Sequence, residues 1–196
     1  TIDPNIGIVE VNDKRLKQLS EIDQPKKVIP AVIEFVDIAG LVAGASEGEG
    51  LGNKFLANIR ETDAIAHVIR CFENDDITHV SGKIDPLSDI QTINTELLLS
   101  DLAIVEKSLT RLKKLSKTGN KDILSELKVM ESIEQELNEG NFLHDIYQKN
   151  KEILKQYNFL TAKPFFLILN VADDETSGNQ YTRDVINYCN EKNISN

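Results

Sequence analysis

The 196-residue sequence has few cysteines and no long apolar run, and both absences exclude classes of protein. Its two cysteines, Cys71 and Cys189, have neither metal-ligand spacing nor the pattern of a disulfide framework, so we expect both to be reduced, structural thiols. No apolar stretch approaches the roughly 18 residues that would indicate a membrane span, and no signal peptide opens the chain. We therefore expect a cytoplasmic protein that does not enter a membrane.

Basic residues are fewer than acidic ones, 22 against 32, and the formal net charge is −10. This balance argues against a protein that is covered with nucleic acid over its whole surface. It does not exclude a local basic patch, which would contain Lys107, Arg111, Lys113, Lys114, Lys117 and Lys121. These residues indicate either the solvated end of a helix or an electrostatic contact with RNA.

The apolar run at residues 32–38 is the segment around which the chain is organised. Its consecutive apolar and β-branched residues predict a strand buried on both faces, as in an α/β sheet. Asp37 stands at the carboxyl end of this strand, where a carboxylate can hold a magnesium ion, and Gly40 follows where a backbone amide can approach a phosphate. An Asp-x-x-Gly pattern also arises by chance as an acidic turn, so alone it does not decide between the two interpretations.

Strand and helix patterns alternate through most of the chain, which predicts an α/β fold with a mostly parallel sheet. His67 lies in the middle of one strand and is expected to be a core residue. Glycines are dense between positions 40 and 52, which indicates a loop whose backbone needs positive φ or close approach. In chain order we predict a strand at 7–11, a short helix capped by Asp13, the strand at 32–38, a helix at 53–61, strands at 64–71 and 164–171, and a helix at 181–192.

A helical insertion interrupts this alternation between residues 86 and 160. Two apolar stripes with spacings of three and four predict two helices that pack as an antiparallel coiled-coil hairpin around the turn at 117–120. A third helix is expected over 146–157. The stripes are Leu98, Leu102, Val105, Leu109 and Leu112 on the first helix, and Ile123, Leu127, Met130, Ile133 and Leu137 on the second. The resulting plan is a core at 1–85, an arm at 86–160 and a second part of the core at 161–196.

Several long and separate stretches closely resemble the YchF/Obg-like ATPase family. They cover residues 1–5, 37–45, 48–56, 70–77, 83–86 and 157–161, so the resemblance extends over nearly the whole chain. It implies a Ras-like P-loop NTPase core with an inserted coiled-coil arm and a carboxyl-terminal TGS domain. It further implies a monomeric, magnesium-dependent hydrolase that uses ATP in preference to GTP or alongside it and that associates with ribosomes, as a molecular switch.

The resemblance also implies roles for individual residues. Thr1 would be the switch I threonine that coordinates magnesium, Asp37 would face the same ion through water, and the Gly40 amide would meet the γ-phosphate. Leu41 occupies the position where Ras-like enzymes usually have the glutamine that orients the attacking water. A leucine side chain forms no hydrogen bond, so we assign no catalytic residue and expect slow turnover.

The base-recognition motif departs from the GTPase pattern Asn-Lys-x-Asp, because residues 170–173 read Asn-Val-Ala-Asp. The lysine that would cover a guanine is absent. We therefore expect Asn170 and the backbone of Val171 to contact adenine, with Asp173 as a further candidate. The alternative for these residues is a capped turn at the end of a strand.

No Gly-x-x-x-x-Gly-Lys-Ser/Thr motif occurs in these residues, although the family's phosphate cradle depends on it. We therefore expect an interior fragment, or the ordered part of a longer chain, with the P-loop upstream and the TGS domain downstream. The fragment alone should be inactive, and the predicted function belongs to the intact protein. The competing hypothesis is a non-catalytic adaptor that binds ribosomal RNA through the basic end of the arm.

Overall fold

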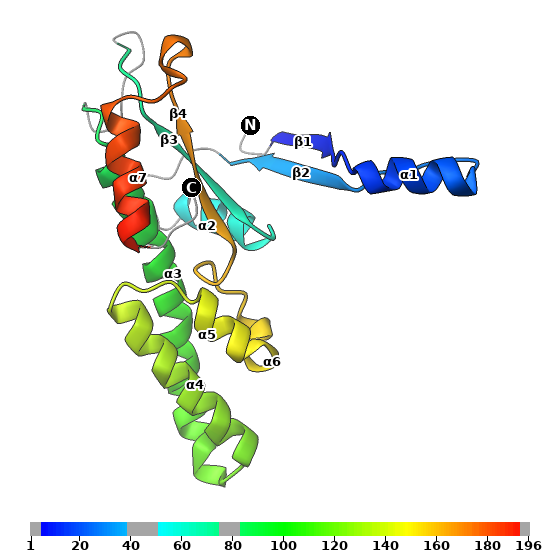
Figure 1. Cartoon of the computed structure of the whole chain (residues 1–196). Coiled ribbons are helices and arrows are strands. Elements are labelled where there is room, and N and C mark those ends of the chain that lie inside the picture. Colours follow the sequence, from blue (N-terminus) through cyan, green and yellow to red (C-terminus); the bar gives the residue numbers. More distant parts are fainter. Residues whose placement is uncertain (1–4, 39–50, 75–82, 193–196) are drawn as a thin grey trace. The chain divides into compact units, whose positions relative to one another are not determined.

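A computed structural model describes residues 5–38, 51–74 and 83–192 (Figure 1). The chain divides into two compact units, Thr1–Gly40 and Leu41–Asn196. We describe each of them by itself. The predicted site residues Thr1, Gly40 and Leu41 lie outside the described residues.

The first unit is a two-stranded antiparallel ribbon with one helix between its strands. Strands β1 (Asn5–Glu10) and β2 (Val32–Asp37) pair over their whole length, from Asn5 opposite Asp37 to Glu10 opposite Val32. Helix α1 (Lys14–Asp23) begins at Asp13, whose carboxylate accepts a hydrogen bond of 2.9 Å from the Arg15 N–H, as the sequence predicts for a capping residue. Both strands and the cap thus follow from local sequence.

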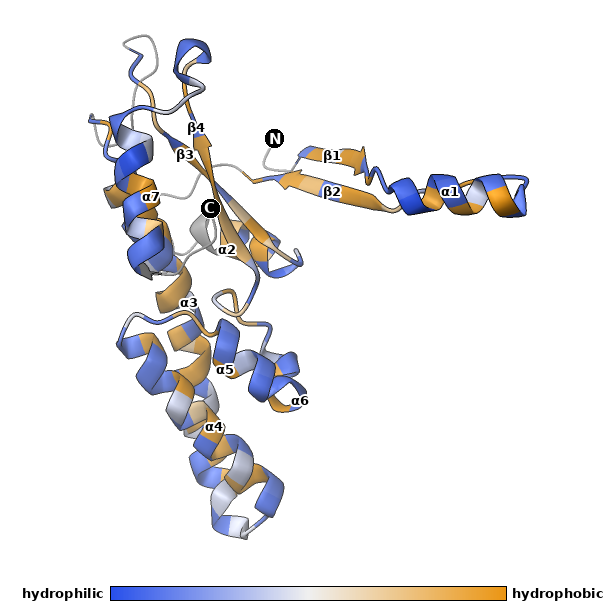
Figure 2. Cartoon of the chain, viewed as in Figure 1, coloured by the Kyte–Doolittle hydropathy of each residue, from blue (hydrophilic) through white to orange (hydrophobic). Residues whose placement is uncertain are grey.

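The prediction that residues 32–38 form a strand buried on both faces is wrong for this chain. Val32, Ile33 and Phe35 remain 52%, 51% and 50% exposed, and Figure 2 shows hydrophobic colouring along much of both strands. Among the described residues β2 pairs with β1 alone, and a two-stranded ribbon has no third layer to cover either face. The apolar sequence therefore predicted the strand correctly but not the exposure of its side chains.

The second unit contains the parallel strands β3 (Ile65–Arg70) and β4 (Phe165–Asn170), which pair from Ile65 opposite Phe165 to Arg70 opposite Asn170. Helix α2 (Leu51–Arg60) precedes β3, and helix α7 (Gln180–Lys192) follows β4. One face of the strand pair is covered by α7 and the first part of helix α3 (Pro86–Leu115), and the shared core contains Ile69, Cys71, Ile90, Leu167, Val185 and Cys189. This arrangement of parallel strands and covering helices is an α/β fold, as predicted.

On the other face of the β3–β4 pair, the described residues Val68, Phe166 and Ile168 are exposed. His67 is largely enclosed on the covered face, as expected for a core histidine, with its ring 6.2 Å from that of Phe165. Burial lowers the pKa of His67 from 6.5 to about 4, against a smaller opposing effect of the Asp89 charge. The imidazole is therefore neutral near pH 7.

The crossover between β3 and β4 is a long helical arm. Helix α3 packs against α4 (Lys121–Asn138), and between them a 3-10 turn (Ser116–Thr118) leads into Gly119, whose φ of 74° suits glycine. Apolar residues of the two helices pack into one core, and Figure 2 shows apolar segments along both helices. The predicted hairpin is thus confirmed, and its fully buried members are Val105, Leu109, Leu112, Met130, Ile133 and Leu137.

The single helix expected over 146–157 is wrong. The chain forms three short pieces instead: α5 (His144–Lys149), α6 (Lys151–Leu154) and a 3-10 turn (Lys155–Tyr157). Asn150 interrupts the helix with φ −123° and ψ 26°, and its side chain donates to the Ile146 carbonyl at 3.0 Å. An asparagine that bonds the local backbone in this way competes with helix continuation.

Within the described ranges, no helix is both long and apolar enough to cross a membrane.

Candidate functional site

The carboxyl ends of β3 and β4 meet at one edge of the strand pair, where open α/β sheets bind ligands. The Cys71 N–H donates to the Asn170 carbonyl at 2.7 Å, so the two chain segments leave the sheet together. Asn170 and Asp173 are exposed there, and Val171 between them is half-buried. The structure thus presents a side-chain amide and a carboxylate on one accessible edge.

The loop that follows β4 is held in place by Asn179. Its side-chain N–H2 donates to the Cys71 carbonyl at 2.6 Å and to the Glu175 carboxylate at 2.7 Å. Within the loop, the Glu175 N–H bonds the Ala172 carbonyl at 2.9 Å. Asn179, which sequence reasoning did not single out, thus links the end of β3 to the turn that follows residues 170–173.

Asn179 also caps helix α7. The Thr182 N–H donates to the Asn179 side chain at 3.0 Å, and the Thr182 hydroxyl accepts from the Asn179 N–H at 2.8 Å, a reciprocal capping pair. Gly178 before it has φ +94°, and a Cβ there would lie 2.9 Å from the Thr182 hydroxyl. The Ser-Gly-Asn sequence before an amphipathic helix is the signal that could have predicted this cap.

The segment after β3 folds back on the strand end through Arg70. Its guanidinium lies 4.8 Å from the centre of the Phe72 ring, and it donates to the carbonyls of Phe72 and Asn74, both at 3.1 Å. The Tyr181 hydroxyl donates to the Glu73 carboxylate at 2.6 Å. Both segments that border the edge are thus anchored, which is the rigidity that a binding site requires.

The predicted magnesium ligand Asp37 belongs to the first unit, where it ends β2 and is exposed. Within the second unit, the structure brings Asn170, Val171 and Asp173 together. Among the described residues no three His, Cys, Asp or Glu side chains form a group that could hold a metal ion. An exposed carboxylate is the oxygen ligand that Mg²⁺ prefers, so Asp37 fits the predicted role by its chemistry.

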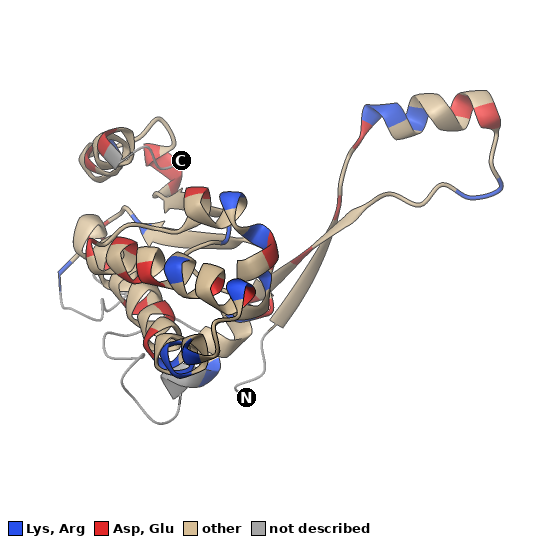
Figure 3. Cartoon of the chain, turned by 90° about the horizontal axis from the view of Figure 1, so that it is seen from below, with Lys and Arg blue, Asp and Glu red and all other residues tan. Residues whose placement is uncertain are grey.

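A second candidate surface is the free end of the arm, which Figure 3 views with Lys and Arg in blue. Lys113, Lys114 and Lys117 are exposed at this end. Arg111 is different, because its guanidinium lies 3.7 Å from the Glu126 carboxylate and 3.3 Å from the Tyr157 hydroxyl. The lysines are therefore better candidates than Arg111 for contact with an anionic partner.

Comparison with known proteins identifies the class to which this fold belongs. A family model of 50S ribosome-binding GTPases matches residues 1–195. The match therefore covers both compact units.

Individual relatives narrow the class. The chain is 56% identical over 183 residues to the ribosome-binding ATPase YchF of Haemophilus influenzae, a match that covers 92% of this chain and 50% of the relative. It is 46% identical over 198 residues to YchF of Bacillus subtilis, covering 98% and 54%. The solved Schizosaccharomyces pombe YchF GTPase aligns with a TM-score of 0.77 at 35% identity, covering 97% of this chain and 53% of the other.

The chain belongs to the YchF/Obg-like branch of the 50S ribosome-binding GTPase family. The resemblance stated from the sequence motifs is thereby confirmed. The chain spans about half the length of the curated relatives it matches.

Proposed function

We propose that the intact protein binds and slowly hydrolyses ATP, in preference to GTP or alongside it, and acts as a magnesium-dependent, ribosome-associated molecular switch. The family supports a nucleotide-binding role, because the relatives carry the names ribosome-binding ATPase and GTPase. The observation that carries the proposal is the anchored edge at Asn170–Asp173, which lies where nucleotides bind in open α/β sheets.

Of the proposed nucleotide site, the described residues include the candidates for base recognition. The Asn170 amide can both donate and accept, which suits the edge of a purine, and the Val171 backbone adds a second contact. Asp173 begins a 3-10 turn (Asp173–Glu175) and is the third candidate. Val171 stands where GTPases have lysine, so no cationic stem covers the base, which supports use of ATP.

The phosphate and metal part of the site involves residues 1–41 together with a P-loop that this sequence does not contain. Thr1 and Asp37 would hold Mg²⁺, which when bound neutralises charge on the phosphate oxygens. Gly40 would offer its backbone amide to the γ-phosphate. Leu41 offers no hydrogen bond to water, and this supports slow turnover.

We propose that residues 1–85 and 161–196 form the nucleotide-binding core and that 86–160 form a coiled-coil arm for ribosome contact, with the protein acting as a monomer. Three exposed lysines at the free end of the arm support this role in an otherwise acidic protein. Contact with RNA phosphates would release counterions and weaken as salt rises.

Hydrolysis is tested by single-turnover measurements on the intact protein with ATP and GTP, with and without ribosomes. Asp37→Asn should lower the rate on the order of tenfold or more, as expected when a metal is held through water. Glu34→Gln, on the same exposed strand, is the matched control and should leave the rate unchanged. Consumption of neither nucleotide would overturn the enzymatic proposal.

The basic end of the arm favours a second candidate function, a non-catalytic ribosome-binding adaptor. Replacing Lys113, Lys114 and Lys117 with glutamate should abolish co-sedimentation with ribosomes at low salt. The equivalent replacement of Lys149, Lys151 and Lys155, exposed lysines of the shorter helices, changes the net charge equally and should have little effect. Unchanged binding by the first variant would exclude the arm's end as the contact, and the hydrolysis assay separates the adaptor from the ATPase.

A further inference from the structure

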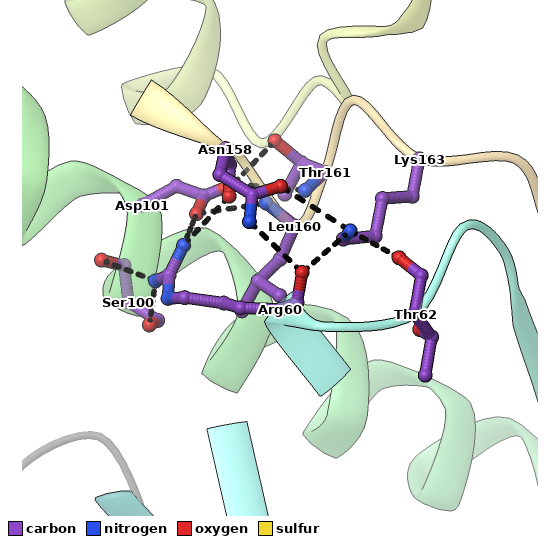
Figure 4. A network of polar contacts seen from close by, with 8 residues as sticks. All are labelled: Arg60, Thr62, Ser100, Asp101, Asn158, Leu160, Thr161 and Lys163. Carbon is purple, nitrogen blue, oxygen red and sulfur yellow. Dashed lines mark hydrogen bonds and ion pairs between the residues drawn. The ribbon is translucent and has the colours of Figure 1, made fainter. Parts of the chain in front are cut away.

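A polar network joins three segments of the second unit that are far apart in the sequence (Figure 4). The three segments are the end of α2, the middle of α3, and the segment that leads from the arm back to β4. Their members in the network are Arg60 and Thr62, Ser100 and Asp101, and Asn158, Leu160, Thr161 and Lys163, respectively. The network therefore lies where the nucleotide-binding core meets the arm.

Asp101 is the most deeply buried charged residue of this network. Its side chain is fully buried and accepts hydrogen bonds from the Leu160 N–H at 3.0 Å and from the Thr161 N–H and hydroxyl, both at 2.8 Å. Burial raises the pKa of Asp101, while these hydrogen bonds and the Arg60 charge oppose the rise. A buried carboxylate with three such donors ties α3 firmly to the returning segment.

Arg60 is less deeply buried than Asp101. Its side chain keeps 22% of its surface exposed and donates to the Ser100 hydroxyl at 2.7 Å, to Asp101 at 3.3 Å and to the Asn158 carbonyl at 3.0 Å. One planar guanidinium thus contacts both α3 and the returning segment, which its fork of donors allows. Losing Arg60 would leave the three bonds from residues 160 and 161 to Asp101 in place.

The backbone end of α2 is held at the same point. The Arg60 carbonyl accepts from the Asn158 side chain at 2.9 Å and from the Lys163 ammonium at 3.0 Å. Lys163 also donates to the Thr62 carbonyl. A cation at the carboxyl end of a helix satisfies its free carbonyls and is favourable to its dipole.

Helices α2 and α3 both extend away from the network. Helix α2 has ten residues and is about 15 Å long. Helix α3 continues from Asp101 into the packed hairpin with α4. A displacement of α2 must therefore either move α3 with it or break the bonds of Arg60.

We propose that Arg60 is a positioning residue that couples α2 to the helical arm, so that nucleotide binding in the core and ribosome binding by the arm influence each other. This inference rests on the proposed function. Coupling of this kind is reciprocal, since each ligand must change the affinity for the other by the same factor.

The test measures ribosome affinity of the intact protein with bound ADP and with a non-hydrolysable ATP analogue. We expect the wild-type affinities to differ by about fivefold or more, and Arg60→Ala to bring their ratio to within about twofold of one. Arg60→Lys should give an intermediate ratio, because lysine cannot span Ser100 and Asn158 with a fork of donors. Arg183→Ala is the matched control, since the Arg183 guanidinium donates to Gln180 of its own helix, and it should keep the wild-type ratio.

Hydrogen exchange without nucleotide gives a second readout. Arg60→Ala should speed exchange of the last amides of α2 but leave those of Leu160 and Thr161 protected by Asp101. An unchanged affinity ratio in Arg60→Ala, even with lower thermal stability, would overturn the coupling role, as would equal wild-type affinities in the two nucleotide states. Failure of the wild-type protein to bind either ligand in separate titrations would instead overturn the proposed function and this inference with it.

Discussion

The helical arm and the strand pairs are both built from apolar residues, but they bury them differently. The α3–α4 hairpin encloses its stripes within the arm, where Met130 and Ile133 are fully buried. Among the described residues, β2 has exposed apolar side chains on both faces, and Val68, Phe166 and Ile168 are exposed on one face of the β3–β4 pair. The two helices of the hairpin are joined by a short turn and cover each other, whereas β3 pairs with β4 only after the whole arm has been added between them.

The most damaging single change should be at the joint between the arm and the core. Asp101→Ala leaves the N–H groups of Leu160 and Thr161 buried without an acceptor, and Arg60 without its carboxylate. We expect the free energy of unfolding to fall by about 3 to 5 kcal/mol in urea titrations followed by circular dichroism.

A milder variant and an exposed control are compared with Asp101→Ala. Asp101→Asn keeps one acceptor and should cost less than Asp101→Ala. Glu131→Ala removes an exposed carboxylate from α4 and should change stability by less than about 0.5 kcal/mol. A loss in Asp101→Ala as small as that in Glu131→Ala would show that the buried network does not hold the joint.

The core of the arm should be the next most sensitive region. Ile133→Ala creates a cavity between α3 and α4 and should cost about 2 to 5 kcal/mol. Leu124 lies on the same helix but is 38% exposed, so Leu124→Ala should cost much less. Equal losses in the two variants would contradict the packing described for the arm.

The covered face of the β3–β4 pair should respond to pH through His67. The unfolded chain protonates this imidazole near pH 6.5, but the folded chain does so only at about 4, so stability is lost as the pH falls between these values. The maximum effect is about 3 kcal/mol. Above pH 7 both states are neutral and the effect disappears.

This pH dependence is isolated by comparison with a variant that cannot titrate. The difference in unfolding free energy between wild type and His67→Leu should be constant above pH 7 and shift against the wild type on acidification. A difference that stays constant down to pH 4 would show that His67 is accessible to protons in the folded chain.

The smallest loss of stability is expected at the edge of the β3–β4 pair where Asn179 holds the loop after β4. Asn179→Ala removes the cap of α7 and the bonds to Cys71 and Glu175, and should cost about 0.5 to 2 kcal/mol. Asn187→Ala, an exposed position in the same helix, should be nearly neutral. If the two variants have the same stability and the same nucleotide affinity, Asn179 does not position residues 170–173.

Local patterns predicted much of the fold. The cap at Asp13, the turn near Gly119 and the paired stripes of the hairpin all depend on residues close in sequence, and the structure confirms them. The exposure of residues 32–37 could not be predicted, because an apolar strand does not specify what covers it. The break at Asn150 was missed because a side-chain bond to Ile146 outweighed the apolar spacing of the helix.

The candidate site was predictable only in part. Residues 170, 171 and 173 were proposed from their position at the end of a strand, and that assignment stays a prediction. Asn179 and Asp101 could not be proposed in this way, because they act through contacts with segments remote in sequence. A charged residue within an apolar stripe, such as Asp101 beside Leu102, is the signal that points to a buried polar joint.

Calorimetric titration of ATP and GTP into the intact protein, with Mg²⁺, tests the central claim most directly. The account predicts saturable ATP binding that is at least as tight as GTP binding and that weakens in Asn170→Ala. No binding of either nucleotide would contradict it, and binding of GTP alone would contradict the assignment of residues 170–173 to adenine.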